Sequence, residues 1–447
     1  MQAFKNLTRK TVFDITSLAW PMAFNAVLLQ SVTLIDLLLI ASLGEVSLAA
    51  FGVAGAIVTF IIGIQVAIAS GTQFVLSRAI GAGDIKKVGV EVAAAWIVNL
   101  AFSLLAMLLL LFGADPLVRA IIADESVAVQ ATSYIEISLC LLIFSSFSQV
   151  IVVYFNSYKN TRIPLYGFLL EIPFNVVCSA ILIYGLWGAP EMGLAGAAWG
   201  SVAAIFIRFG YLAYRFKQEV DKGRVGGFGA VNYAATKLHL LEVTPVVSNF
   251  AVLLTGQMMF QVLFAQLSVS AFAAITLIMP WIKIGGLFVN SWAKASTIFV
   301  SQFIGKGDVK SIKPFVLQSS LVATLMSIVM MFCYFLFSQS LPHIYNNLSP
   351  ETITALAIIA PSYILIPIFR TSNMFCGNMI RAMGESYSIV RINFVTLWLI
   401  ALPTGALLIY LDAPLLMVFS IILFDEMMKF YKFRKTLMRT LNSYVVL

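Results

Sequence analysis

The sequence predicts an all-α transmembrane protein whose twelve helices form two six-helix bundles related by a pseudo-twofold axis. Hydrophobic residues make up 61% of the 447 residues and charged residues only 11%, whereas soluble domains carry about 25% charged residues. Apolar runs long enough to cross a bilayer, which takes roughly 20 helical residues, follow one another along the chain. The second half also repeats features of the first. Together these observations exclude a water-soluble fold.

Charged and turn residues separate the apolar runs into twelve predicted spans. Their ranges are 14–41, 46–77, 89–113, 127–155, 163–187, 192–216, 239–266, 271–300, 314–341, 352–379, 388–411 and 414–433. The first span lacks the short apolar core and small-residue cleavage site of a secretory signal. We therefore expect it to remain as the first span of a multi-pass protein.

Lysine and arginine residues mark one side of these spans. Of the 28 basic residues, 23 lie in the N-terminal tail, in the loops after even-numbered spans or in the C-terminal tail. We count Lys429 as part of this C-terminal tail. The loops on the opposite side hold Arg119. Basic loops stay in the cytoplasm, so we expect both termini to be cytoplasmic. The membrane that we expect is the cytoplasmic (inner) membrane of a bacterium or archaeon. The net charge of +8 therefore reflects topology and does not indicate nucleic-acid binding.

A shift of 224 residues superimposes the second half of the chain on the first. It places Pro21 on Pro245, and it places SRAIGAGDIKK (77–87) on SQFIGKGDVKS (301–311) without a gap. Because each half holds six spans, an even number, both halves enter the membrane from the same side, with a cavity between them. The expected domains are an N-lobe over residues 1–216, a cytoplasmic linker over 217–238 and a C-lobe over 239–447.

One carboxylate lies inside the first predicted span, within the apolar stretch Trp20–Gly44. A charge inside a membrane helix is disfavoured by at least about 3 kcal/mol, and apolar surroundings favour the neutral form of a carboxyl group. Asp36 is therefore expected to face a polar cavity, where it exchanges a proton or pairs with a cation. The alternative is a structural polar contact with a neighbouring helix. The repeat places Phe260 on Asp36, so we expect the site in one lobe only.

The chain carries several short motifs in a fixed order. They are the WP pair at 20–21, Asp36, a G-x-G-D loop after span two and again after span eight, YGLWGAPEMGLAGAAWGS (184–201) and IRAMGES (380–386). Twelve spans with these motifs resemble the multidrug and toxic compound extrusion (MATE) family, and its bacterial NorM-like branch in particular. The resemblance implies an exporter, not an enzyme. Such an exporter moves amphipathic and mostly cationic drugs by alternating access, driven by inward flow of protons or sodium.

The resemblance also implies which residues form the coupling site. Asp36 belongs to the N-lobe coupling site of the family, together with Asn175 in span five and Ser201 in span six. In part of the family a second carboxylate follows Asn175 by four residues, but that position holds Ser179 here.

Sodium-coupled members carry a pair of acidic residues in spans seven and ten. Those positions hold Leu253 and Arg370 in this chain. Proton coupling is therefore favoured over sodium coupling. We expect no cofactor and no metal site, because His239 and His343 lie far apart at span ends.

Further polar residues inside the spans have two interpretations each. Proline removes a backbone hydrogen bond and can bend a helix, so Pro21 with Asn25 forms either a gate or a packing bend. Glu171, like Glu136, either lines the N-lobe cavity or forms an ion pair with Arg208. Four further polar residues either line the substrate cavity or make interhelical hydrogen bonds: Tyr134, Gln30, Gln65 and Asn156. Phe260 either lines the same cavity or packs in the core.

Three basic residues lie inside the predicted C-lobe spans, namely Lys283, Lys294 and Arg370. They do not suit a pocket for cationic drugs alone, so they pair with acids, stay near the membrane edges or receive an anionic group. The last option favours a second hypothesis, a flippase for lipid-linked headgroups or polysaccharides from the same exporter superfamily. A non-transporting receptor or scaffold would leave the intramembrane Asp and the repeat unexplained. The expected partners are small-molecule drugs and the lipid bilayer, without nucleic acid, and we expect the chain to work as a monomer.

Overall fold

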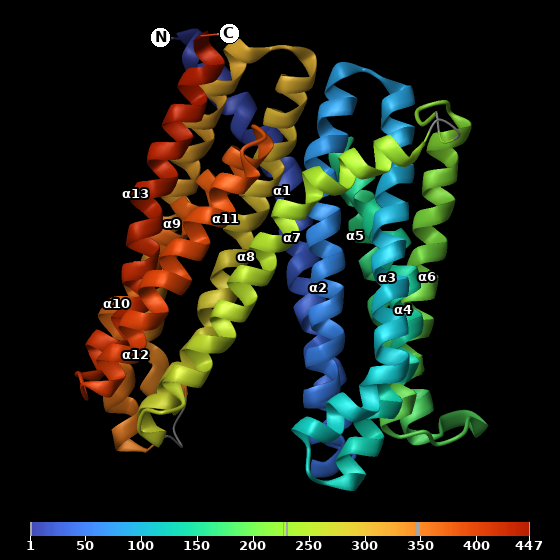
Figure 1. Cartoon of the computed structure of the whole chain (residues 1–447), viewed down its shortest axis with the longest axis vertical. Coiled ribbons are helices and arrows are strands. Elements are labelled where there is room, and N and C mark those ends of the chain that lie inside the picture. Colours follow the sequence, from blue (N-terminus) through green and yellow to red (C-terminus); the bar gives the residue numbers. More distant parts are fainter. Residues whose placement is uncertain (1, 227, 229–230, 345–348, 447) are drawn as a thin grey trace. The chain divides into compact units, whose positions relative to one another are not determined.

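The computed structural model describes residues 2–226, 228, 231–344 and 349–446, and every regular element in these ranges is helical (Figure 1). The elements are α1 (Gln2–Ala41), α2 (Glu45–Ala82), α3 (Ile85–Ile121), α4 (Glu125–Ser157), α5 (Arg162–Tyr184), the short 3-10 turn η1 (Leu186–Gly188), α6 (Leu194–Asp221), α7 (Tyr233–Phe264), α8 (Val269–Lys306), α9 (Val309–Ile344), α10 (Pro350–Ala382), α11 (Ser386–Phe394), the π-helical segment η3 (Val395–Ala401), α12 (Leu402–Tyr410) and α13 (Leu415–Val446).

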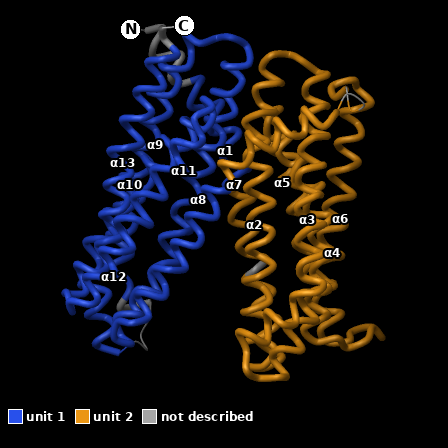
Figure 2. Tube along the Cα trace, in the orientation of Figure 1, with its two compact units in different colours: residues 1–23, 248–447 blue, residues 24–247 orange. Residues whose placement is uncertain are grey.

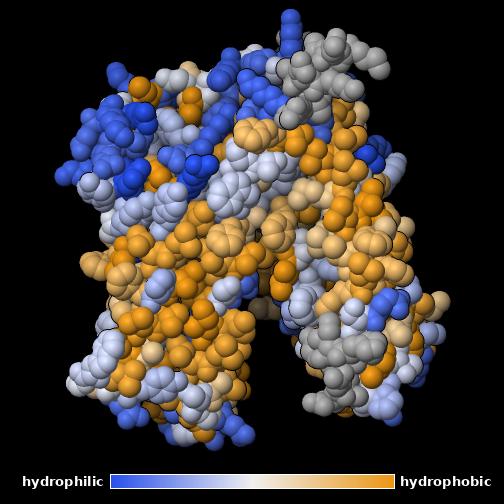
Figure 3. Space-filling model, turned by 180° about the vertical axis from the view of Figure 1, so that it is seen from behind, coloured by the Kyte–Doolittle hydropathy of each residue, from blue (hydrophilic) through white to orange (hydrophobic). Residues whose placement is uncertain are grey.

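Eleven helical stretches are long and apolar enough to cross a membrane, with α11, η3 and α12 joined as one. This confirms the predicted all-α transmembrane fold class. The twelfth long helix, α13, carries charged residues along its length, including Asp425, Glu426 and Lys429. On the face shown in Figure 3, hydrophobic residues cover the middle of the helices and hydrophilic residues gather toward their ends. Exposed side chains such as Phe112 on α3 and Phe332 on α9 are therefore suited to contact lipid.

The two G-x-G-D loops have the same local structure. α2 ends at Gly83, whose φ of 73° lies in the left-handed region, and α8 ends at Gly307 with a φ of 72°. Only glycine adopts this conformation without strain. Asp84 then begins α3 by accepting a hydrogen bond from the Lys87 backbone N–H at 2.9 Å. The internal repeat predicted from these loops is thus present in their backbone.

The chain folds as two compact units. Unit 2 contains residues 24–247, and unit 1 contains residues 1–23 together with 248–447 (Figure 2). The division therefore falls inside α1 and α7, and not at the linker predicted over 217–238. The two boundaries are 224 residues apart, which is the period of the repeat. Each follows a proline by two residues, Pro21 in α1 and Pro245 in α7.

Hydrogen bonds and ion pairs hold the first part of α7 within unit 2. The ring of His239 is buried, with Nε2 lying 3.0 Å from Thr72 Oγ1 and Nδ1 lying 2.8 Å from Glu91 Oε2. Arg78 and Glu242 form an ion pair nearby. These polar contacts explain why residues 233–247 fold with α2 and α3, although the sequence suggests that they begin the C-lobe.

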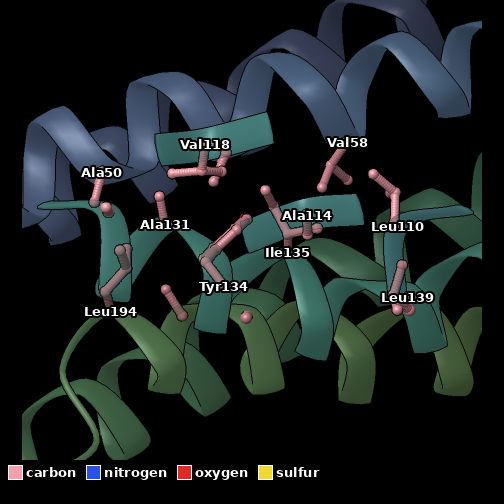
Figure 4. Packing of buried hydrophobic residues seen from close by; sticks show 14 of the residues in the cluster. Ala50, Val58, Leu110, Ala114, Val118, Ala131, Tyr134, Ile135, Leu139 and Leu194 are labelled. Carbon is pink, nitrogen blue, oxygen red and sulfur yellow. The ribbon is translucent and has the colours of Figure 1, made fainter. Parts of the chain in front are cut away.

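Small residues form much of the core of unit 2 and let its helices approach closely. Figure 4 shows Ala50 of α2, Ala114 of α3 and Ala131 of α4 among the buried residues of this core. α6 packs on α5 through two glycines spaced four apart. A Cβ atom on Gly196 would lie 2.5 Å from the Leu182 backbone, and one on Gly200 would lie 2.6 Å from Ser179 Cα.

Replacing Gly200 with Ala is expected to lower the free energy of unfolding by about 1–3 kcal/mol, the usual cost of overpacking. The added methyl group would collide with backbone atoms of α5, which cannot move aside as a flexible side chain can. Thermal unfolding of the detergent-solubilised protein measures the effect. Gly210→Ala is the matched control because a Cβ there meets no atom within 4 Å. Equal melting temperatures for the two variants would contradict the prediction.

The core of unit 1 is built on large aromatic residues. Phe260 and Phe264 stack with ring centroids 5.6 Å apart, and Phe419 lies 6.4 Å from Phe264. Phe260 is buried in this cluster, and a Cβ on Gly405 would be 3.7 Å from its ring. The structure therefore supports the packing interpretation of Phe260 and not a place in a substrate cavity.

Candidate functional site

Asp36 lies in the second half of α1, in unit 2, and its side chain is only 8% exposed. Its Oδ1 atom is buried and has no hydrogen-bond partner among the described residues. The Asn175 amide of α5 is within hydrogen-bonding reach of the Asp36 carboxyl group. Burying a charged carboxylate without full compensation is costly. The site therefore favours a protonated Asp36 or a bound cation.

Asn175 joins α5 to α6 beside Asp36. Its Nδ2 donates a hydrogen bond of 3.0 Å to Ser201 Oγ, and its Oδ1 is buried without a partner among the described side chains. The structure thus brings together the three residues that the resemblance assigned to the coupling site: Asp36, Asn175 and Ser201.

Glu171 forms an ion pair with Arg208 of α6, as one of its two interpretations predicted. The distance from Arg208 Nη1 to Glu171 Oε2 is 2.6 Å, and the two side chains are 4% and 14% exposed. The guanidinium group also lies over the Phe168 ring, 4.5 Å from its centroid. Glu171 is close enough to Asp36 to repel it electrostatically. Arg208 is thus engaged by Glu171, and Asp36 forms no ion pair with a basic residue among the described residues.

Tyr134 of α4 is buried near Asp36. Its ring meets Phe51 edge to face, with centroids 5.5 Å apart and an interplanar angle of 85°. Figure 4 shows it among the apolar residues of unit 2. Tyr134 therefore forms part of the apolar wall around the carboxyl group.

Other predicted site residues lie elsewhere or have structural partners. Gln65 is fully buried, and its Nε2 donates hydrogen bonds to Ser103 Oγ at 2.6 Å and to the Leu142 carbonyl at 2.8 Å. It therefore ties α2 to α3 and α4, while its Oε1 is buried without a partner among the described residues. Ser179 lies against Gly200 at the crossing of α5 and α6. Gln30 is exposed on α1, and Asn156 is buried near the end of α4.

The predicted gate residues lie within an unbroken helix. α1 continues from Gln2 to Ala41 with Pro21 inside it. Asn25, one turn after Pro21, has a buried Oδ1 without a hydrogen-bond partner among the described residues. The unit boundary after residue 23 lies between these two side chains.

Unit 1 contains a buried charged network that the sequence analysis did not find. Asn373 Nδ2 donates to the Glu426 carbonyl at 2.7 Å and to its Oε2 at 2.8 Å. Arg370 Nε lies 3.6 Å from Glu426 Oε1, and Asp425 pairs with Lys429 one turn along α13. Asp425 and Glu426 lie inside the predicted span 414–433, so a charge within an apolar span was the signal that could have found them.

The basic residues of the C-half occupy three different environments. Lys429 is buried in α13 beside Asp425, which corrects its prediction as part of an exposed cytoplasmic tail. Lys283 is exposed on α8, whereas Lys294 is half-buried. Lys294 lies close enough to Arg381 of α10 for electrostatic repulsion. Neither Lys283 nor Lys294 forms an ion pair with an acidic residue of the described chain.

Comparison with known proteins agrees with this architecture. The MatE family model matches residues 21–181 and 245–407, one segment in each half. The chain is 24% identical over 416 residues to the uncharacterized transporter YisQ of Bacillus subtilis, covering 91% of this chain and 89% of that protein. It is 22% identical over 352 residues to the probable multidrug resistance protein NorM of Thermotoga maritima, covering 77% and 74%.

Among solved structures, the fold is similar to the Vibrio cholerae MATE transporter VcmN in its bent form. The TM-score is 0.85 at 20% identity, and the match covers 98% of this chain and 99% of that one. The matches in both halves and the shared fold agree with the motifs identified in the sequence. The chain therefore belongs to the MatE family of multidrug and toxic compound extrusion transporters, which are multi-pass membrane proteins.

Proposed function

We propose that this transporter exports amphipathic, mostly cationic small molecules by proton antiport, with Asp36 as the coupling carboxylate. The observation that carries the proposal is the buried Asp36 carboxyl group, whose Oδ1 has no partner among the described residues. An ionised carboxylate there lacks a compensating positive charge. A proton supplies that compensation by neutralising the group, and a cationic drug supplies it by pairing with the group.

Proton and drug compete for the Asp36 carboxylate, and this competition couples their movements when the site opens to each side of the membrane in turn. A proton that enters from the outside neutralises Asp36 and releases the drug. Loss of the proton to the cytoplasm restores the carboxylate, which then binds the next cation. Because each ligand binds one charge state of the same side chain, binding of one opposes binding of the other. The multidrug name of the Thermotoga maritima relative supports small-molecule drugs as the cargo.

Two residues of unit 1 support protons over sodium as the coupling ion. Leu253, at the first of the positions that resemble the sodium-coupled acid pair, offers no side-chain oxygen to a cation. Arg370, at the second, itself carries a positive charge and pairs with Glu426. We also propose that the protein works as a monomer in the cytoplasmic membrane, with both termini in the cytoplasm and no bound cofactor.

Ethidium movement in proteoliposomes tests the choice of coupling ion. We expect an imposed pH gradient to drive ethidium transport by the wild-type protein, and an imposed sodium gradient without a pH gradient to drive none. Liposomes without protein correct for passive leak. Transport driven by sodium alone would contradict proton coupling, although it would leave Asp36 as a candidate cation site.

One observation favours the second hypothesis, transport of an anionic lipid-linked headgroup. Lys294 and Arg381 of unit 1 are close enough to repel each other and form no ion pair with an acidic residue in the described ranges. A phosphate would offer negative charge to both. Expressing cells distinguish the two functions. Resistance to ethidium supports drug export, whereas unchanged resistance with an altered distribution of lipid-linked sugars supports the flippase.

A further inference from the structure

A small cavity lies inside unit 1, between α8, α9 and α10. Its polar lining residues are Arg370 and Thr371 of α10 and Tyr334 of α9, and its apolar lining includes Ile282, Met330 and Met374. The volume is about 20 Å³, which is room for about one water-sized group. The cavity can therefore receive one functional group of a larger molecule rather than a whole drug.

Gly285 sets the shape of this cavity. A Cβ atom there would lie 2.1 Å from the Tyr334 hydroxyl and 2.5 Å from the terminal methyl of Met330. The absence of a side chain lets Tyr334 approach α8, where its hydroxyl donates a hydrogen bond of 2.9 Å to the Trp281 carbonyl. Tyr334 is thereby fixed beside Arg370.

The charge in the cavity is positive and only partly balanced. The Arg370 side chain is 29% exposed, and its ion pair is the long contact of 3.6 Å from Nε to Glu426 Oε1. Glu426 is already engaged by Asn373 at 2.8 Å. The two terminal amino groups of Arg370 form no hydrogen bond or ion pair with the described residues. Both donors are therefore available to a group that enters the cavity, which Arg370 lines.

The helices that form the cavity walls add almost no negative charge. α8 and α9 contain no Asp or Glu, and the one acidic residue of α10 is Glu351 in its first turn. Two more cations, Lys294 and Arg381, lie on α8 and α10. Arg381 is eleven residues beyond Arg370, which corresponds to about 16 Å along a helix. The charged side chain that lines the cavity is therefore the cation Arg370, and its acidic neighbour is Glu426 of α13.

We propose that Arg370 binds the carboxylate of amphipathic substrates in this cavity. A guanidinium group offers a planar pair of N–H donors that matches the two oxygens of a carboxylate. Met330 and Met374 make the rest of the lining apolar, which suits the carbon atoms that join such a carboxylate to a larger body. The inference rests on the proposed export function and names the residue that holds the carboxylate of a zwitterionic substrate.

Two dyes that differ in one group test this inference. Rhodamine B carries a free carboxylate on a cationic ring system, and its ethyl ester carries none. Arg370→Gln is expected to weaken binding and transport of rhodamine B at least about tenfold, because it removes the charge-assisted hydrogen bonds to the carboxylate. The ethyl ester and ethidium are expected to change less than twofold. Lys283→Gln, which removes an exposed cation from α8, is the matched control and should affect neither dye.

A second variant separates substrate binding from charge balance. In Arg370→Gln, Glu426 loses its cation, so the double variant Arg370→Gln/Glu426→Gln restores neutrality and protects the fold. The same selective loss of rhodamine B in the double variant supports the proposal. Recovery of rhodamine B transport there, or an equal loss of all three dyes in either variant, would overturn it.

Direct binding to the purified protein separates this proposal from the export function. Fluorescence anisotropy of the two rhodamines measures binding without any ion gradient. If the wild type moves no dye but still prefers the acid to the ester through Arg370, the export function fails and the carboxylate site stands. If the wild type transports ethidium but binds acid and ester equally, the carboxylate site fails and the export function stands.

Discussion

Replacing Asp36 with Asn is expected to abolish ethidium transport driven by a pH gradient and to leave the protein folded. The amide has nearly the shape of the carboxyl group and can still interact with Asn175, so the surrounding packing is retained. It binds no proton in the physiological range and carries no charge for a cationic drug. The variant therefore lacks the group for which proton and drug compete.

The measurement is ethidium flux in proteoliposomes, with elution from a sizing column and thermal unfolding as tests of the fold. Glu136→Gln is the matched control, because it removes a carboxylate that is exposed on α4 of the same unit. We expect the control to keep wild-type flux. Full flux in Asp36→Asn would refute the proposed coupling role and direct attention to the Glu171–Arg208 pair.

Replacing Arg208 with Met is expected to destabilise unit 2 by about 3–5 kcal/mol, the cost of leaving a buried charge without its partner. Arg208 is 3% exposed, and its removal would leave the Glu171 carboxylate unpaired among apolar side chains. The double variant Arg208→Met/Glu171→Leu removes both charges, so we expect it to recover most of the lost stability.

Thermal unfolding in detergent compares the single and double variants. Arg119→Met is the control, because Arg119 pairs with Asp115 and Glu125 through side chains that are largely exposed. A surface pair of this kind contributes about 0–1 kcal/mol. If the double variant were as unstable as Arg208→Met, the effect would come from lost packing and not from the unpaired charge.

The fold was predictable because its main signals are local. Apolar runs of membrane length mark the helices, and the left-handed glycines Gly83 and Gly307 mark matching helix ends. The unit boundaries were not predictable in this way. α1 and α7 continue as helices through Pro21 and Pro245, and nothing in a continuous helix indicates that its two parts pack with different partners.

The site was only partly predictable for a related reason. A charged group in an apolar span stands out, which identified Asp36. Neutral polar residues do not, because Gln65 and Asn175 have the same sequence context whether they tie helices together or surround a binding site. Lys429 was misassigned because it lies near the C-terminus among other basic residues. Its partner Asp425 lies inside the predicted span 414–433 and carries the same signal as Asp36, but the basic residues that follow it led us to assign this end of the chain to topology alone.

The matched division of α1 and α7 has a consequence for the origin of the chain. Each half begins with about 23 residues that fold with the other half, at boundaries separated by one repeat. A single ancestral half would therefore have left its own first segment without packing partners. Two copies that exchanged these segments would have satisfied both, as in a domain-swapped homodimer. In such a dimer, fusion of the two genes would join subunits that are already interlocked.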